Sequence, residues 1–134
     1  MTASSQQAPD QGPQGLFNGM GIWHAQRPPK YPEWVILKFD MPARRTKLSM
    51  EAQPERAPGT GEFKRSPKSF VLQGSPDGTT WSDLLKVQNN QYDQGGVWKS
   101  WSFRNSNSYL YYRIYIMAND GDPDLLTVAG LKLE

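Results

Sequence analysis

The chain has 134 residues, a net charge of +2 and no Cys, and it carries 5 Trp, 6 Tyr and 5 Phe. The missing Cys excludes a disulfide framework, a thiolate zinc site and a cysteine nucleophile, and the aromatic content excludes a wholly disordered chain. No apolar run approaches the ~20 residues of a membrane-spanning helix, and the N-terminus lacks the basic start and apolar stretch of a secretory signal. We therefore expect one soluble domain, whose location the sequence leaves open between a virion, a cell surface and the cytoplasm.

The first 14 residues are rich in Ser, Gln and Pro and hold almost nothing that a core would bury. Such a segment gains too little from burial to offset the conformational entropy lost on ordering. The sequence therefore predicts a flexible N-terminal tail over residues 1–14 and a folded domain over residues 15–134.

Short apolar runs separated by Gly, Pro, Asn and Asp clusters fill the rest of the chain, and no window shows the 3.6-residue period of a helix. Strands are predicted at residues 34–39, 46–52, 69–73, 98–103, 110–117 and 126–133, with an extended or short helical segment at 81–87. At least seven extended runs without helical crossovers predict an all-β fold, an antiparallel β-sandwich or jelly roll.

Two local patterns make this prediction specific. In residues 46–52, the alternation places Leu48 and Met50 on one face and polar side chains on the other, as in a strand with one wet face. Residues 75–80 (SPDGTT) form a predicted turn, because Pro presets one corner and Gly78 can adopt a positive φ.

The run at 110–117 is the most aromatic strand of the prediction. Its alternation places Tyr112, Ile114 and Ile116 on one face. An Asn/Ser-rich turn separates this run from the one at 98–103, so the two are predicted to form an antiparallel hairpin.

Five strings along the chain resemble, in family order, the motifs of discoidin domains, the coagulation-factor type C or galactose-binding-like family. They are FNGMGIWH (17–24), WVILKFD (34–40), FVLQGSPDGTTW (70–81), YYRIYI (111–116) and VAGLKL (128–133). The resemblance covers about residues 16–134. It implies a jelly-roll β-sandwich of about eight antiparallel strands, and a binding module without catalytic activity.

Many members of that family hold a structural calcium ion, and the resemblance places the three side-chain ligand positions at Asn18, Gly21 and Gly130. Since calcium sites need several oxygen ligands and glycine offers no side chain, we expect no calcium there and no other cofactor. The acidic loop at residues 119–124 lacks the spacing of an EF-hand, so we interpret it as a solvated turn.

The resemblance also indicates a sugar site at one loop-bearing end of the sandwich. Sugar-binding relatives use the His of the Trp-His string, here His24, and an aromatic side chain about three residues later. Position 27 is Arg27 instead, so Tyr31 or Trp23 is the candidate for a stacking platform. The alternative for His24 is a hydrogen bond to backbone at a corner of the sandwich.

An Arg after the following strand completes the site of such relatives, and the best positional match is Arg56. Lys64 and Arg65 are the alternatives. All three belong to a long loop at residues 55–67, and long loops within compact domains are often functional.

Two further aromatic residues are candidates for ligand contact. Tyr92 lies within the polar loop at residues 89–96 and Trp98 follows it, and a flexible loop can leave both rings exposed. Arg113 is expected to pair inside the domain with a carboxylate such as Asp40 rather than with a ligand.

We therefore predict a non-catalytic module that binds a carbohydrate, because one His and no nucleophile or metal motif leave no catalytic constellation. The alternative is a structural or protein-interaction module, a homo-oligomer or a part of a larger assembly such as a bacteriophage virion or surface appendage. Residues 27–68 hold 10 basic and 5 acidic side chains, but these are scattered, so the sequence does not favour nucleic acid or anionic lipid as the partner.

Overall fold

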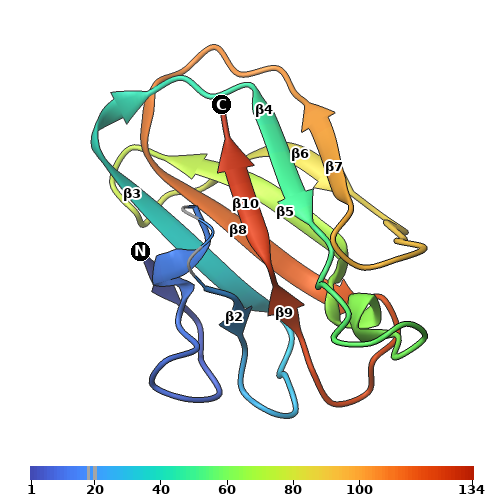
Figure 1. Ribbon diagram of the computed structural model, residues 1–134. Coiled ribbons are helices and arrows are strands. Elements are labelled where there is room, and N and C mark those ends of the chain that lie inside the picture. Colours follow the sequence, from blue (N-terminus) through green and yellow to red (C-terminus); the bar gives the residue numbers. More distant parts are fainter. Residues whose placement is uncertain (18, 20) are drawn as a thin grey trace.

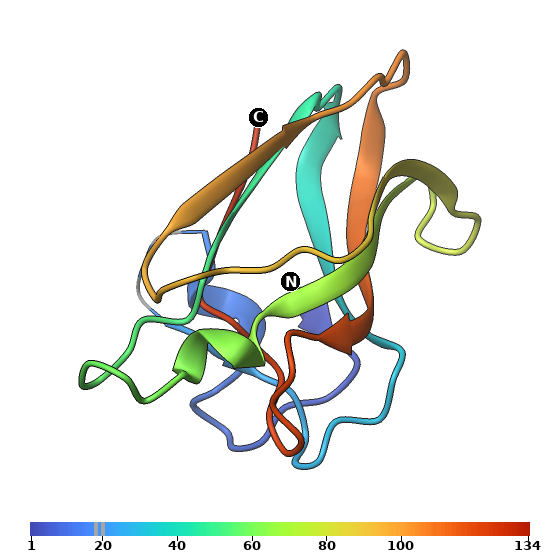
Figure 2. The same ribbon diagram turned by 90° about the vertical axis from the view of Figure 1, so that its right-hand side faces the viewer.

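Two antiparallel sheets face each other in the computed structural model, which describes residues 1–17, 19 and 21–134 (Figures 1 and 2). The larger sheet has the order β1 (Thr2–Ala3), β3 (Glu33–Ala43), β8 (Tyr109–Asn119), β5 (Pro67–Ser75) and β6 (Ser82–Val87). The smaller has the order β10 (Gly130–Leu133), β4 (Lys47–Glu51) and β7 (Trp98–Ser102), and a short pair joins β2 (Trp23–His24) to β9 (Thr127–Val128). The all-β jelly-roll prediction is therefore confirmed, and the 81–87 segment is a strand.

Single 3-10 turns, η1 (Pro13–Gly15) and η2 (Glu62–Arg65), are the helical elements among the described residues. In that part of the chain, no helix has the length and apolar character that crossing a membrane would require.

The core lies between the two sheets and is built from the faces that the alternation predicted. Leu48 and Met50 of β4 are fully buried, and they face Tyr112, Ile114 and Ile116 of β8, which are equally buried. The predicted turn after β5 is also confirmed, because Gly78 has φ +81° and the Asp77 carboxylate accepts hydrogen bonds from the backbone N–H groups of Thr79 and Thr80 at 2.9 and 3.0 Å.

The predicted hairpin between residues 98–103 and 110–117 is wrong. Strand β7 pairs with β4 in the smaller sheet, whereas β8 lies between β3 and β5 in the larger one. The Asn/Ser-rich segment between them crosses from one sheet to the other, as Figure 2 shows at the top of the sandwich. The side chain of Trp101 in β7 accordingly meets Phe70 of β5 across the core, with ring centroids 5.4 Å apart.

The expected pairing of Arg113 with Asp40 is also wrong. Arg113 lies on the outer face of the larger sheet, where its guanidinium stacks over Trp81 at 4.2 Å and over Tyr115 at 4.8 Å from the ring centroids. Its Nε donates to Gln73 Oε1 at 2.7 Å. Aromatic faces and an amide take the place of the predicted carboxylate, a common environment for a guanidinium.

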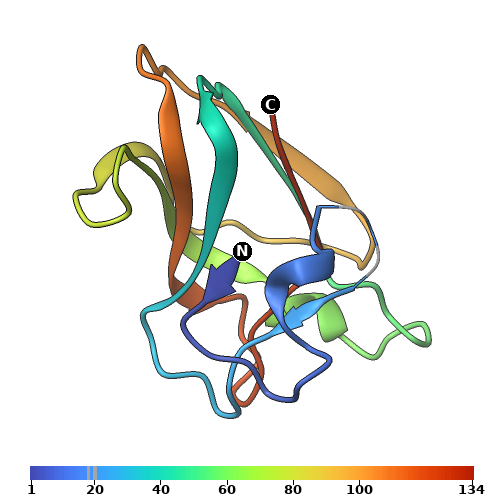
Figure 3. The same cartoon turned by 90° about the vertical axis from the view of Figure 1, so that its left-hand side faces the viewer.

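The N-terminal segment packs against the sandwich. The structure therefore departs from the prediction of a flexible N-terminal tail over residues 1–14. Strand β1 pairs with β3 in the register Thr2↔Ile36, and Figure 3 shows the segment running along that edge. Its anchor is polar: the Ser4 N–H donates to Trp34 O at 2.8 Å, and the Ser5 hydroxyl donates to Glu33 at 2.7 Å. Hydrogen bonds to backbone and to a buried carboxylate hold a segment that has little apolar surface to bury.

Candidate functional site

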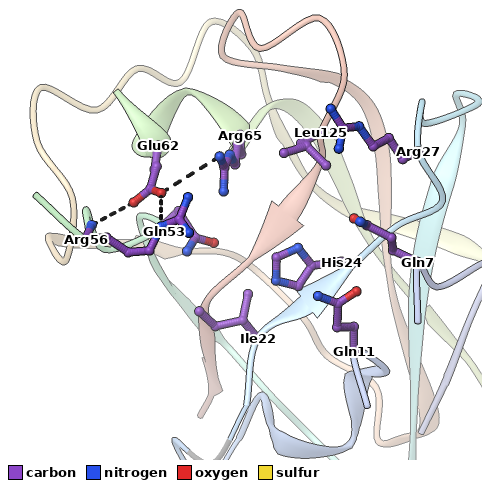
Figure 4. Close-up of a pocket in the computed structure, with 10 residues that line it drawn as sticks. All are labelled: Gln7, Gln11, Ile22, His24, Arg27, Gln53, Arg56, Glu62, Arg65 and Leu125. Carbon is purple, nitrogen blue, oxygen red and sulfur yellow. Dashed lines mark hydrogen bonds and ion pairs between the residues drawn. The ribbon is translucent and has the colours of Figure 1, made fainter. Parts of the chain in front are cut away.

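A hollow of about 590 Å³ opens at the end of the sandwich where β2 meets the long loop after β4 and the loop before β9 (Figure 4). We call it the His24 hollow, and its lining residues are Gln7, Gln11, Ile22, His24, Arg27, Gln53, Arg56, Glu62, Arg65 and Leu125. Of the residues that the sequence singled out, the structure brings His24, Arg27, Arg56 and Arg65 together here.

His24 reaches the hollow because of the alternation within β2. Trp23 pairs with Val128 and His24 with Thr127, so the indole turns into the core and the imidazole turns outward. The backbone of His24 is fixed on its other side by the N-terminal segment: its N–H donates to Gln11 O at 3.1 Å and its carbonyl accepts from the Gln7 N–H at 2.9 Å. The segment predicted to be a tail therefore forms one wall of the site.

The His24 imidazole is neutral at pH 7, because partial burial lowers its pKa below the ordinary value of 6.5. The nearby Arg65 guanidinium lowers that pKa further, and the Asp10 carboxylate opposes the shift. A neutral imidazole offers one donor and one acceptor. Both are available for the hydroxyl groups of a ligand.

We expect the His24 imidazole to titrate with a midpoint below 6.5, which NMR of its ring protons measures. The unfolded state then binds more protons than the folded state as pH falls through that range, so the free energy of unfolding decreases on acidification below 6.5. Replacing Arg65 with Gln is expected to move the midpoint upward, because a cation is removed. A midpoint at or above 6.5 in the unmodified protein contradicts the partial burial of the His24 imidazole, and an unchanged midpoint in Arg65→Gln contradicts its placement near Arg65.

Glu62 organises the long loop opposite His24. Its side chain is only 3% exposed, and its carboxylate accepts from the backbone N–H of Arg56 at 2.7 Å and from Arg56 Nε at 2.6 Å. These two hydrogen bonds are the main cause of the lowered pKa of Glu62. Its Oε1 also lies 3.8 Å from Arg65 Nη2. The Glu62 carboxylate is thus committed to the protein and stays ionised.

Three residues that line the hollow each have one buried polar atom without a hydrogen-bond partner among the described residues. Two of these atoms are acceptors, the Oε1 atoms of Gln11 and Gln53, and one is a donor, Arg65 Nε. A buried polar group without a partner costs about 1–3 kcal/mol, and such groups cluster where a ligand or ordered water completes their hydrogen bonds. The hollow is therefore prepared for a molecule that both donates and accepts hydrogen bonds.

The outer rim is cationic and more exposed. Arg27 Nη2 lies 3.6 Å from Asp124 Oδ2, and both side chains are more than half exposed, so the pair adds little stability. Tyr31, the candidate platform, is partly exposed but does not line the hollow. Burial of its hydroxyl raises the pKa of Tyr31 to about 12, an effect that a hydrogen bond with the backbone of Asn119 reduces.

Three residues predicted to contact a ligand lie outside the hollow. For two of them, Trp23 and Tyr92, the structure corrects the prediction, because they are buried. Trp23 is fully buried and its Nε1 donates to Ser5 O at 2.8 Å, so its ring faces are covered by the core. Tyr92 is also buried, and its hydroxyl donates to Met50 O at 3.1 Å. Trp98 is 40% exposed, but it lies on the smaller sheet, where Lys132 Nζ sits 4.6 Å from its ring centroid.

No sequence pattern predicted the glutamines of the hollow. Gln7 and Gln11 belong to a polar segment that shows no hydrophobic periodicity, and Gln53 is a loop residue that follows β4. Only their positions in the folded structure identify them. Arg65, by contrast, was already an alternative for the second cationic residue of the site.

The described residues do not fit the calcium site of the family. Gly21 and Gly130 offer no side-chain oxygen, and a side chain at position 130 would meet Glu51 Oε1 and the Trp98 ring, both 2.9 Å from its Cβ. No group of three or more His, Asp or Glu side chains able to hold a metal occurs in the part of the chain that the structure describes. Asn18, the third position, lies outside that part.

The carboxylates of the acidic loop before β9 contact groups of the protein itself. Asp122 Oδ1 accepts from the backbone N–H groups of Asp124 and Leu125 at 2.8 and 2.9 Å, while Asp122 Oδ2 lies 3.6 Å from Arg65 Nε. The loop is a turn whose carboxylates face the arginines of the hollow.

The family model of the F5/8 type C domain matches residues 1–129. No curated protein sequence matches the chain.

Solved structures of carbohydrate-binding modules share the fold. Chitosan-binding module 1 of a chitosanase/glucanase from Paenibacillus sp. IK-5 has a TM-score of 0.77 at 17% identity, covering 99% of this chain and 92% of that one. The Clostridium perfringens module CpGH89CBM32-5, in complex with GalNAc-β-1,3-galactose, has 0.68 at 19%, covering 98% and 91%. The CBM32 of AlyQ, in complex with 4,5-unsaturated mannuronic acid, has 0.73 at 13%, covering 99% and 92%.

Proposed function

The chain belongs to the F5/8 type C domain family, and we propose on this premise that it is a non-catalytic module that binds a carbohydrate in the His24 hollow. The observation that carries the proposal is the convergence, in one hollow, of His24 with the three residues that each have an unpartnered polar atom. The sugars named with two of the structural neighbours support it. Nothing in the family match or the neighbours favours the alternative of a virion or appendage component.

The polar groups of the hollow match the chemistry of a sugar. Hydroxyl groups both donate and accept, so they can donate to Gln11 and Gln53 Oε1 and accept from Arg65 Nε. The neutral imidazole of His24 adds one donor and one acceptor. Among the described residues that line the hollow, Ile22 and Leu125 are the only apolar ones. Binding would therefore depend on hydrogen bonds more than on stacking.

The same residues argue against catalysis. Glycoside hydrolysis uses two carboxylates on either side of the scissile bond, whereas Glu62 is the one carboxylate among the described residues that line the hollow. Its pKa is lowered by hydrogen bonds from Arg56, so it cannot act as a proton donor near neutral pH. The described residues that line the hollow thus lack the pair of carboxylates that this hydrolysis uses.

Replacing His24 with Ala is expected to weaken the binding of a sugar by about tenfold or more, because it removes a donor and an acceptor from the centre of the hollow. A glycan array identifies a sugar that binds, and isothermal titration calorimetry measures the change in affinity. Lys99→Ala is the matched control, since Lys99 lies at a different hollow beside Tyr92. Binding that survives in His24→Ala, or that is absent from every glycan tested, contradicts the proposal.

A further inference from the structure

We propose that the His24 hollow selects a glycan that carries a carboxylate, a uronic acid residue, over its neutral counterpart, because the partly buried guanidinium of Arg65, whose Nε has no hydrogen-bond partner among the described residues, sits in a wall lined by three arginines. The inference rests on the proposed function and names the class of sugar. Figure 4 shows the three guanidiniums of Arg27, Arg56 and Arg65 around the opening, with His24 facing them.

The lining of the hollow carries an excess of positive charge. Three arginines contribute to it, while Glu62 is the one carboxylate among the described lining residues. That carboxylate is taken up by Arg56 through hydrogen bonds of 2.6 and 2.7 Å. Its hydrogen bonds go to Arg56, whereas Arg65 meets Glu62 and Asp122 only in longer ion pairs of 3.8 and 3.6 Å.

Arg65 is the residue that points to an anion. Its side chain is only 18% exposed, and its Nε is buried without a hydrogen-bond partner. The nearest carboxylate oxygens lie at 3.6 Å, on Asp122, and at 3.8 Å, on Glu62, whereas charge-assisted hydrogen bonds to carboxylates have lengths of about 2.7–2.9 Å. The guanidinium thus keeps its capacity for a direct, two-pronged contact with a ligand carboxylate.

The carboxylates around Arg65 lie beyond hydrogen-bond distance of its guanidinium. Asp122 Oδ1 already accepts two backbone hydrogen bonds that shape the loop before β9. The rim cation Arg27 pairs with Asp124, and this solvent-exposed pair is 3.6 Å apart. A ligand carboxylate would meet the partly desolvated Arg65 inside the hollow and the weakly paired Arg27 at its rim.

The hollow also lacks the feature that favours neutral sugars. A neutral sugar gains much of its affinity by laying an apolar C–H face on an aromatic ring, yet none of the described lining residues is aromatic. Trp23 is turned into the core and Tyr31 lies outside the lining. Charge and hydrogen bonding are what this surface can offer a ligand.

The test compares matched pairs of sugars on the whole chain by calorimetry. Oligosaccharides of mannuronate, glucuronate and galacturonate are each measured against the mannose, glucose or galactose oligosaccharide of the same length and linkage. We expect at least one uronate to bind about tenfold more tightly than its neutral partner, with a preference that shrinks as salt rises. Neutral sugars that bind as well as, or better than, their uronates in every pair overturn this inference and leave the proposed function standing. Absence of binding across all pairs and across the glycan array contradicts the proposed function itself.

A charge-removing variant assigns the preference to Arg65. Arg65→Gln is expected to weaken the binding of the uronate about tenfold more than the binding of its neutral partner, so that the preference for the uronate is lost. Lys64→Gln is the matched control, because it removes the same charge from the adjacent, exposed residue of η2. Arg65→Lys, which restores the charge, is expected to recover part of the preference, and thermal unfolding of each variant shows that it remains folded. A preference that survives in folded Arg65→Gln, or is lost equally in Lys64→Gln, overturns the assignment.

Discussion

Replacing Trp23 with Ala is expected to lower the free energy of unfolding by about 3–5 kcal/mol, the usual cost of deleting a large aromatic side chain from a core. Trp23 is completely buried in the cluster between the two sheets. Its Nε1 donates to Ser5 O at 2.8 Å, so the substitution also leaves that carbonyl without its partner. Urea unfolding followed by circular dichroism measures the loss.

The controls separate a core role from a ligand role. Trp98→Ala removes a ring that is 40% exposed, and we expect it to cost less than about 1 kcal/mol. Trp23→Phe keeps most of the apolar volume, and it should fold and retain sugar binding. A Trp23→Phe protein that is as stable as the original yet no longer binds would make Trp23 a ligand residue after all.

Replacing Glu33 with Ala is expected to destabilise the domain by about 3 kcal/mol or more, because buried donors lose their acceptor. Glu33 is fully buried at the start of β3. Its Oε1 accepts from the hydroxyls of Ser4 and Ser5, and its Oε2 accepts from Gln26 Nε2 at 3.1 Å and from the Lys30 N–H at 2.9 Å. One carboxylate thus joins the N-terminal segment and the loop after β2 to the larger sheet.

Hydrogen exchange shows whether Glu33 holds the N-terminal segment in place. In Glu33→Ala, the Ser4 amide, which donates to Trp34 O at 2.8 Å, should exchange much faster than in the original protein. Glu33→Gln keeps one acceptor oxygen and should lose less stability, about 1–2 kcal/mol. An unchanged Ser4 exchange rate together with unchanged stability in Glu33→Ala would mean that residues 1–5 do not depend on this carboxylate.

The strands of the core could be predicted from the sequence because each carries its own periodic signal. Tyr112, Ile114 and Ile116 alternate along β8 and are all buried, as period two requires. Which strand pairs with which carries no such signal. The turn between β7 and β8 has the composition of a hairpin turn, yet it crosses between the sheets, because Trp101 packs against Phe70 from the opposite side of the core.

The N-terminal segment shows the other limit of sequence patterns. Residues such as Ser4 and Ser5 have no apolar surface that would predict order, and their fixed positions depend on a buried carboxylate about thirty residues away. Polar anchoring of this kind becomes visible only when both partners are placed in space. For the same reason, the sequence did not predict that Gln11, which belongs to this segment, lines the hollow.

The site was predicted in part. His24 carries the motif of the family, and Arg56 and Arg65 were candidates from a long loop; all three line one hollow. The aromatic candidates did not join them, since exposure of Trp23 and Tyr92 depends on the packing of the whole core. The Trp-His string alone does not show which of the two side chains faces outward. The pairing of β2 with β9 determines this.

NMR of side-chain resonances during a sugar titration tests most directly whether the His24 hollow is the binding site. With the tightest-binding sugar of the panel, the His24 ring, the side-chain amides of Gln11 and Gln53, and the Arg65 Nε–H are predicted to shift in proportion to occupancy. The indole N–H of Trp98, on the smaller sheet, is predicted to stay in place. Shifts centred on Trp98, with His24 and Arg65 unmoved, would contradict the placement of the sugar in the hollow.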